Sequence, residues 1–289
     1  MSGIRGAVGR GVLSALVVGV IVCTARPAAA SDFNPVQWCQ VRLSFMGRKF
    51  FREWSGEISL CQQRRMKGEL PESAKCFPED IQRVDQTTYC QPATDPNVDP
   101  NYQRRLCRAE SHSHEKIQRK CEDDYLSQIH LGVPCGTVAT VAQLQDCIDF
   151  QAHGHDAVDF TRTVFGNTGR IDDEAARKCM TAIFTVGEIY ARQVMQTIGD
   201  KCEMFVMAGK LSGPCPDPDA QKKLNKARRG FAKGVLSDCQ QQLDNHLITL
   251  GAPCDKLGPA ATASDYVNCL AGVAEDVAIR GVGTVWYGN

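Results

Sequence analysis

The chain has 289 residues, of which 33 are basic, 33 are acidic and 43% are hydrophobic. This neutral balance argues against a nucleic-acid-binding protein, because such proteins usually carry a basic surface. The 15 cysteines include no Cys-x-x-Cys pair, so zinc ribbons, thioredoxin-like redox sites and c-type haem attachment lack their motif.

Residues 1–30 are predicted to be a secretory signal peptide. A short basic region comes first, residues 11–22 are apolar and uncharged, and the A-x-A cleavage site Ala28-Ala29-Ala30 precedes Ser31. The apolar run is shorter than the roughly 20 residues that a transmembrane helix needs. Charged residues interrupt every later apolar run. We therefore expect an exported protein, secreted or periplasmic, that has no transmembrane segment.

Removal of the signal peptide takes away Cys23 and leaves 14 cysteines, an even number. In an exported chain this is typical of a disulfide framework, so we expect structural cysteines rather than nucleophiles or metal ligands. The predicted disulfide cysteines are Cys39, Cys61, Cys76, Cys90, Cys107, Cys121, Cys135, Cys147, Cys179, Cys202, Cys215, Cys239, Cys254 and Cys269.

The cysteines bring an internal repeat into register. Leu131-Gly132-Val133-Pro134-Cys135 recurs as Leu250-Gly251-Ala252-Pro253-Cys254, and six cysteines of the first half match six of the second. The repeat predicts two homologous units, at 31–167 and 168–289, with a hinge at 168–173.

The first unit contains an insertion at about 85–110. The matched cysteines are 139 to 141 residues apart before this region and 118 to 122 residues apart after it. Cys90 and Cys107, which have no counterpart, both lie in the insertion, so we expect them to bond to each other.

Each unit is predicted to contain about three helices. Apolar residues recur three or four positions apart in 36–67. Three stretches of the second unit, 179–205, 224–250 and 266–277, show the same spacing. The alternation typical of strands is essentially absent. The predicted fold class is therefore all-α, with two tandem disulfide-stapled helical units.

Glycine and proline mark the expected breaks between helices. Gly209 and Gly213 are expected to end the first helix of the second unit, and Asp217 lies where the next helix should be capped. Gly132 and Gly251, each two residues before a proline, are expected to end the second helix of their units.

Helix lengths give a predicted pairing for the six matched cysteines of each unit. The second and third flank the first turn, and the fourth and sixth are placed at similar heights on facing helices. The predicted disulfides are Cys61–Cys76, Cys121–Cys147 and Cys39–Cys135 in the first unit, and Cys202–Cys215, Cys239–Cys269 and Cys179–Cys254 in the second.

Asp95-Pro96-Asn97-Val98-Asp99-Pro100-Asn101 resembles the start of a calcium loop, with oxygen-bearing side chains at every second position. An EF-hand loop needs Gly at position 6 and Glu at position 12, which here are Pro100 and Leu106. We therefore interpret the stretch as two Asp-Pro-Asn turns.

Two His-x-His pairs, His112 with His114 and His153 with His155, are candidate metal ligands. Residues two apart on a helix point to different faces, so neither pair chelates a metal alone. His155 falls on the apolar stripe of its segment and is expected to be a core or edge residue. We expect no metal and no cofactor.

Catalytic signatures such as G-x-S-x-G, H-E-x-x-H and G-x-x-x-x-G-K-[ST] are absent from the sequence. Asp172-Asp173-Glu174 suggests acid/base chemistry, but the stretch lies at a predicted helix start, where acids favour the helix dipole. We expect a protein that is not an enzyme.

The arrangement resembles a loose group of Cys-rich helical repeat proteins secreted by bacteria. The residues that carry the resemblance are the two Leu-Gly-x-Pro-Cys copies and the segment Gly209 to Asp217, with its Gly-Lys start and Pro-Cys-Pro-Asp end. The first unit departs from the pattern at Ala74-Lys75-Cys76-Phe77-Pro78. The resemblance implies helices and secretion, and it implies no activity.

Three functions compete on this sequence. The cysteine density, the repeat and the missing motifs favour an exported, non-enzymatic scaffold or interaction protein. Phe45, Phe50, Phe51 and Trp54 crowd the first helix, which suggests a carrier of a lipid or another apolar ligand. The third is an enzyme with a dispersed site, for which the sequence offers no residue. The expected partner is a protein or an apolar small molecule, not a nucleic acid.

Overall fold

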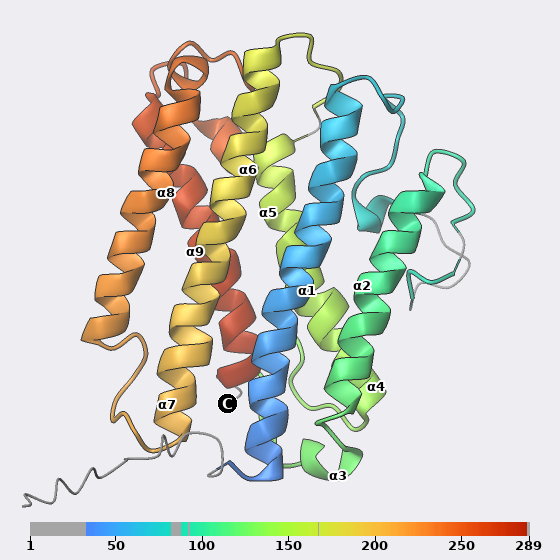
Figure 1. Ribbon diagram of the computed structural model, residues 1–289, viewed down its shortest axis with the longest axis vertical. Helices are drawn as coiled ribbons and strands as arrows, with labels where there is room; N and C mark the ends of the chain where they lie inside the picture. The colour runs from blue at the N-terminus through green and yellow to red at the C-terminus, as the bar shows by residue number, and fades with distance from the viewer. Residues whose placement is uncertain (1–32, 82–87, 92, 167, 288–289) are drawn as a thin grey trace, which may run out of the picture. The chain divides into compact units, whose positions relative to one another are not determined.

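The structure is a computed structural model that describes residues 33–81, 88–91, 93–166 and 168–287. The predicted signal peptide and part of the predicted insertion lie outside the described residues. Residues 33–289 form one compact unit, and its described part contains helices and no β-strand (Figure 1). The all-α prediction is confirmed.

Two of the helices contain a π-helical segment that continues directly into the next α-helix. The α-helices are α1 (Pro35–Met66), α2 (Pro100–Gln118), α3 (Asp123–Leu126), α4 (Val141–Asp146), α5 (His155–Phe165), α6 (Glu174–Met195), α7 (Met204–Met207), α8 (Pro218–Asp244) and α9 (Ala263–Trp286). The π-helical segments are η2 (Cys147–Gly154), between α4 and α5, and η3 (Gln196–Glu203), between α6 and α7. Short 3-10 turns are η1 (Pro78–Asp80) and η4 (Cys254–Lys256).

The long helices form two layers. Figure 1 shows α8, α6, α1 and α2 side by side, with α5 and α9 behind them, and neighbouring helices in this order are in contact. A core of buried side chains from both predicted repeats, including Phe51, Phe160 and Phe231, lies between the layers. The two repeats, which stay a prediction from the cysteine spacing, therefore share one body.

Local chemistry explains where the helices begin. Asn34 and Gln37 form a capping box at the start of α1, with Pro35 as its first residue. Asp217 caps α8 by accepting a hydrogen bond from the Ala220 N–H (2.8 Å), as the sequence predicted. Asp173 likewise caps α6, so the acidic stretch at 172–174 is a helix start.

The disulfides follow one pattern in both repeats: first with fourth, second with third, and fifth with sixth. Cys61–Cys76, Cys202–Cys215 and Cys90–Cys107 confirm the prediction. The other four predicted pairs are wrong, because the observed bonds are Cys39–Cys121, Cys135–Cys147, Cys179–Cys239 and Cys254–Cys269.

The antiparallel packing of α6 on α8 explains the error. Cys179 near the start of α6 meets Cys239 near the end of α8, with their Cα atoms 5.0 Å apart. The loop at the other end of the pair is already closed by Cys202–Cys215. Cys254 and Cys269 therefore close the loop before α9.

Each Leu-Gly-x-Pro-Cys segment docks on the last helix of the other repeat. The Gly132 N–H donates to the Thr284 carbonyl of α9 (2.8 Å), and the Thr284 hydroxyl donates to the carbonyl that follows Gly132 (2.9 Å). Gly251 and Thr163 of α5 make the equivalent contacts at 2.7 and 2.8 Å. The two repeats are thus interlocked by reciprocal contacts.

The prediction that Gly132 and Gly251 end helices is wrong. The helix α2 ends at Gln118 and α8 ends at Asp244, well before these glycines. The residue with left-handed backbone after α8 is His246, at a φ of 51°, and not Gly251. The glycines instead allow a close backbone approach, because a Cβ at either position would overlap a carbonyl oxygen of the opposing helix.

The connection 168–173 is held against α1. The Arg65 guanidinium donates to the Thr168 carbonyl (2.6 and 3.1 Å), and the Ile171 N–H donates to the Met66 carbonyl (2.9 Å). The predicted hinge is therefore tied to the central helix of the fold.

Candidate functional site

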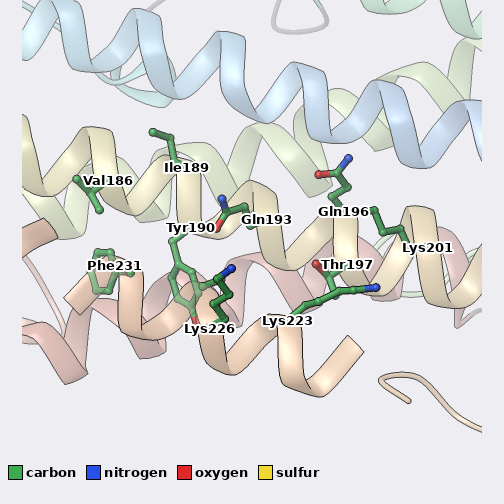
Figure 2. Close-up of a pocket in the computed structure, with 12 residues that line it drawn as sticks. Val186, Ile189, Tyr190, Gln193, Gln196, Thr197, Lys201, Lys223, Lys226 and Phe231 are labelled. Atoms are coloured by element: carbon green, nitrogen blue, oxygen red, sulfur yellow. The ribbon is translucent and has the colours of Figure 1, made fainter. Parts of the chain in front are cut away.

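A groove with a volume of about 490 Å³ lies between α6 with η3 and α8 (Figure 2). This volume is within the usual range of small-molecule sites. The groove is lined by Val186, Ile189, Tyr190, Gln193, Gln196, Thr197, Lys201, Lys223, Lys226, Ala227, Gly230 and Phe231. We call it the α6–α8 groove.

The charge of the α6–α8 groove is entirely positive. Lys201 comes from η3, and Lys223 and Lys226 lie one turn apart on α8. No carboxylate is among the described residues that line the groove, and none of the three lysines forms an ion pair with a described residue. Gln193, Gln196 and Thr197 add neutral hydrogen-bonding groups, so the groove is suited to an anionic group.

The floor of the α6–α8 groove is apolar and rigid. The rings of Tyr190 and Phe231 are stacked with centroids 5.3 Å apart and an interplanar angle of 17°. The Tyr190 hydroxyl donates to Glu275 of α9, which also accepts a hydrogen bond from Arg228 (3.3 Å). The Tyr190 ring is therefore held in place from behind. Both rings are buried, at 2% exposure each, and the apolar surface that is open to a ligand comes from Val186, Ile189 and Ala227 beside them.

The sequence analysis missed this site because it considered only the net charge of the whole chain, in which acids elsewhere offset the local basic residues. Six basic residues lie between 220 and 237, and no acid lies among them. A local run of this kind is the signal that could have found the groove.

Two further crevices, on the side of the fold where α5 and α9 lie, are related to each other by the repeat. The first, about 550 Å³, lies beside Val133 and Pro134, and the second, about 410 Å³, lies beside Ala252 and Pro253. All nine residues that line the second crevice have repeat counterparts that line the first, 121 residues away on the helices and 119 in the docked segments. The reciprocal docking of the repeats therefore creates a pair of equivalent crevices.

An ion pair is shared by the two crevices. Asp159 of α5 and Arg280 of α9 occupy equivalent repeat positions, line both crevices and lie 2.8 Å apart. Arg280 also donates to Asp156 (2.9 Å), whose pKa burial raises to about 7. His155, Asp156 and Asp159 have the side-chain types of a metal site, but the Arg280 guanidinium already pairs with both carboxylates. We assign no metal there.

The structure contradicts the expected placement of His155. His155, predicted to lie in the core or at its edge, has a side chain that is 58% exposed, whereas His153 is buried. The cause is η2, in which i to i+5 hydrogen bonding adds residues to each turn and shifts the apolar stripe. Sequence periodicity assumes 3.6 residues per turn, so it misplaces side chains after such a segment.

His153 lies in a cradle formed by two glycines. A Cβ at Gly47 of α1 or at Gly281 of α9 would overlap its ring. Neither ring nitrogen has a hydrogen-bond partner among the described residues, and the same holds for Asp156 Oδ2. We call this arrangement the His153 cradle.

The His153 cradle is expected to make the fold sensitive to acid. Burial lowers the pKa of His153 to about 4, against about 6.5 in an unfolded chain. Between these values the unfolded chain binds more protons, so the stability present above pH 6.5 is lost as the pH falls to 4. The shift corresponds to about 3 kcal/mol.

Urea unfolding of the wild type and of His153→Leu at several pH values tests this prediction. Relative to the variant, the wild type should lose about 3 kcal/mol between neutral pH and pH 4. A difference that stays constant over this range would contradict the prediction. His155→Leu, which alters an exposed ring two residues away, is the matched control.

The other His-x-His pair also has separate surroundings. His114 lies 3.3 Å from Asp149 Oδ2, and Ser113 donates to Asp149 Oδ1 (2.8 Å). Burial raises the pKa of Asp149 to about 6. Burial alone would lower the pKa of His114, but the neighbouring Asp149 carboxylate outweighs it and the pKa is raised. His112 instead contacts Lys49 Nζ (2.6 Å). The two histidines therefore have different partners and do not face a common site.

The oxygen-rich stretch at 95–101 forms two local turns. Asp95 accepts from the Asn97 N–H (2.8 Å) and Asp99 accepts from the Asn101 N–H (2.9 Å). Asp99 also pairs with Arg64 (2.5 Å). This agrees with the turn interpretation, and the absence of calcium binding stays a prediction.

The aromatic residues that suggested a carrier mostly belong to the core. Phe50, Phe51 and Trp54 are buried against other rings, including Phe160 and Tyr89. Phe45 alone of the four is exposed.

Comparisons with known proteins found no relative of this chain. No protein-family model matches the chain, and no curated protein or solved structure is similar to it. Within the described residues, no helix combines the length and apolarity that crossing a bilayer requires. The described residues are all-α and contain seven disulfides, which fits an oxidising compartment.

Proposed function

We propose that this chain is an exported, non-enzymatic binding protein and that its α6–α8 groove holds an anionic ligand with an apolar part. One observation carries the proposal: the described residues that line the groove include three lysines and no carboxylate, and the apolar side chains of Val186, Ile189 and Ala227 lie beside the buried stacked pair Tyr190 and Phe231. A carboxylate or phosphate satisfies the lysines, and an alkyl or ring portion covers the floor. A fatty acid has this chemistry.

The disulfides support a rigid scaffold for this groove. The two helices that form it are bonded near both ends of their contact, by Cys179–Cys239 and by Cys202–Cys215. The distance between Tyr190 and the lysines of α8 is therefore held before a ligand arrives, which lowers the entropic cost of binding.

Calorimetric titration with a medium-chain fatty acid tests the proposal. The acid should bind, the alcohol of the same chain length should bind more weakly, and the alkylammonium should not bind. Since exposed ion pairs each contribute up to about 1 kcal/mol, Lys201→Gln/Lys223→Gln/Lys226→Gln should weaken binding about tenfold or more. Added salt should weaken it further.

Two more variants make the test specific. Gly230 lines the groove, and a Cβ there meets no atom within 4 Å, so Gly230→Phe should block the groove without disturbing the core. Lys120→Gln, outside the groove, should bind as the wild type does. Equal binding by Gly230→Phe and the wild type would refute the assignment of the ligand to this groove.

A further inference from the structure

The outward side of α8 is a row of unpaired cations. Lys222, Lys226, Arg229 and Lys233 are three or four residues apart, so they form one stripe on the helix. All four are exposed, and none forms an ion pair with a described residue. The core side of the same helix carries Phe231 and the other buried residues. We call the four residues the α8 stripe.

Beside the α8 stripe, the middle of α6 exposes uncharged and apolar side chains. Helix α6 lies next to α8 in Figure 1, and its exposed residues there include Thr185, Ile189 and Gln193. The Ile189 side chain is 41% exposed. On α1, beyond α6, Phe45 is 45% exposed at the edge of a small hollow that Arg48 and Arg192 also line. Cations and apolar groups are therefore combined on one face.

We propose that this face, formed by α8, α6 and α1, docks on the surface of an anionic lipid bilayer. The inference rests on the proposed function, because the α6–α8 groove in the same face would take an anionic lipid from that surface. Membrane-surface helices place lysines and arginines toward the headgroups and bury apolar side chains at the boundary of the acyl chains. The α8 stripe fits the first role, and Ile189 and Phe45 fit the second.

The combination favours lipid over a soluble polyanion. A polysaccharide or nucleic acid would satisfy the α8 stripe through its charged groups. It would leave the exposed Ile189 without a role, since isoleucine offers no ring on which a sugar or a base could stack. A bilayer surface satisfies the cations and the apolar side chains together, and the groove between them takes one amphiphile.

Sedimentation with vesicles tests the proposal. The wild type should bind phosphatidylcholine vesicles that contain about one third phosphatidylglycerol, and it should not bind pure phosphatidylcholine. Lys222→Gln/Arg229→Gln/Lys233→Gln should weaken this binding about a hundredfold, because each cation near such a surface contributes about fivefold. Phe45→Ser/Ile189→Ser should weaken it several-fold with the charge unchanged.

Control variants separate this proposal from the previous one. Lys116→Gln/Lys120→Gln/Lys256→Gln removes the same net charge outside the three helices and should bind vesicles as the wild type does. None of the substitutions on the α8 stripe in the test lines the groove, so that variant should still bind the soluble fatty acid. Gly230→Phe should still bind vesicles.

Three results would overturn the docking surface. The first is full vesicle binding by the α8 stripe variant, and the second is an equal loss in both triple variants. The third is binding of heparin or single-stranded DNA by a wild type that leaves the anionic vesicles unbound. Loss of fatty-acid binding in Gly230→Phe with vesicle binding retained supports both proposals separately.

Discussion

Replacing Gly251 with alanine is expected to lower the free energy of unfolding by about 4 kcal/mol, which is exceptional for one methyl group. The added Cβ would overlap the carbonyl oxygen of Arg162 and lie 3.0 Å from the Gly166 Cα. Both neighbours are backbone atoms, so no side-chain rotation relieves the clash. The docked segment must then move away from α5.

That movement breaks two hydrogen bonds that join the repeats. The Gly251 N–H loses the Thr163 carbonyl, and the Thr163 hydroxyl loses the carbonyl after Gly251. Each unsatisfied buried group costs about 1–3 kcal/mol, which is added to the cost of overpacking. Gly132→Ala should behave in the same way, because its Cβ would overlap the Gly283 carbonyl oxygen of α9.

Denaturant unfolding of Gly132→Ala, Gly251→Ala and Gly258→Ala measures the effect. Gly258 lies in the loop before α9, and a Cβ there meets nothing within 4 Å, so its substitution should change stability little. If Gly251→Ala were as stable as Gly258→Ala, the reciprocal docking would not hold the repeats together.

The sequence predicted those parts of the fold that depend on local periodicity. The stripe in 36–67 became α1, the stretch at 224–250 contains most of α8, and the stretch at 266–277 contains half of α9. The bonds Cys61–Cys76 and Cys202–Cys215 were predictable because each joins two cysteines that flank the first turn of its unit. Short sequence separation alone was not enough, since Cys135–Cys147 and Cys254–Cys269 span only 12 and 15 residues and were missed.

The main errors about the fold concern how helices pack on one another. Cys179–Cys239 depends on which ends of α6 and α8 meet, and the role of Gly251 depends on α5, which is distant in sequence. The burial of His153 depends on η2, whose extra residues per turn leave no periodic signal. The α6–α8 groove was missed for a different reason, since its lysines were visible in the sequence but were counted only in the net charge.

Replacing Gly47 with alanine is the second change with a large expected effect, a loss of about 3 kcal/mol or more. The Cβ would overlap the His153 ring, lying 2.9 Å from Cε1 and closer still to Nε2. The ring cannot move away from this Cβ, because Gly281 of α9 packs against its other side. A Cβ at Gly281 would lie 2.6 Å from Cε1. Either α1 or η2 must therefore shift within the core.

A second substitution identifies the cause. In the His153→Ala background the ring is gone, so Gly47→Ala should cost little and is expected to gain up to about 1 kcal/mol from helix propensity. Gly56→Ala on the same helix, where a Cβ meets nothing within 4 Å, should show this gain in the wild-type background. Thermal and denaturant unfolding of the four members of the cycle gives the coupling between positions 47 and 153. If the two substitutions were additive, steric contact in the His153 cradle would not be the source of the loss, and the close packing of α1, η2 and α9 would have to rest on other contacts.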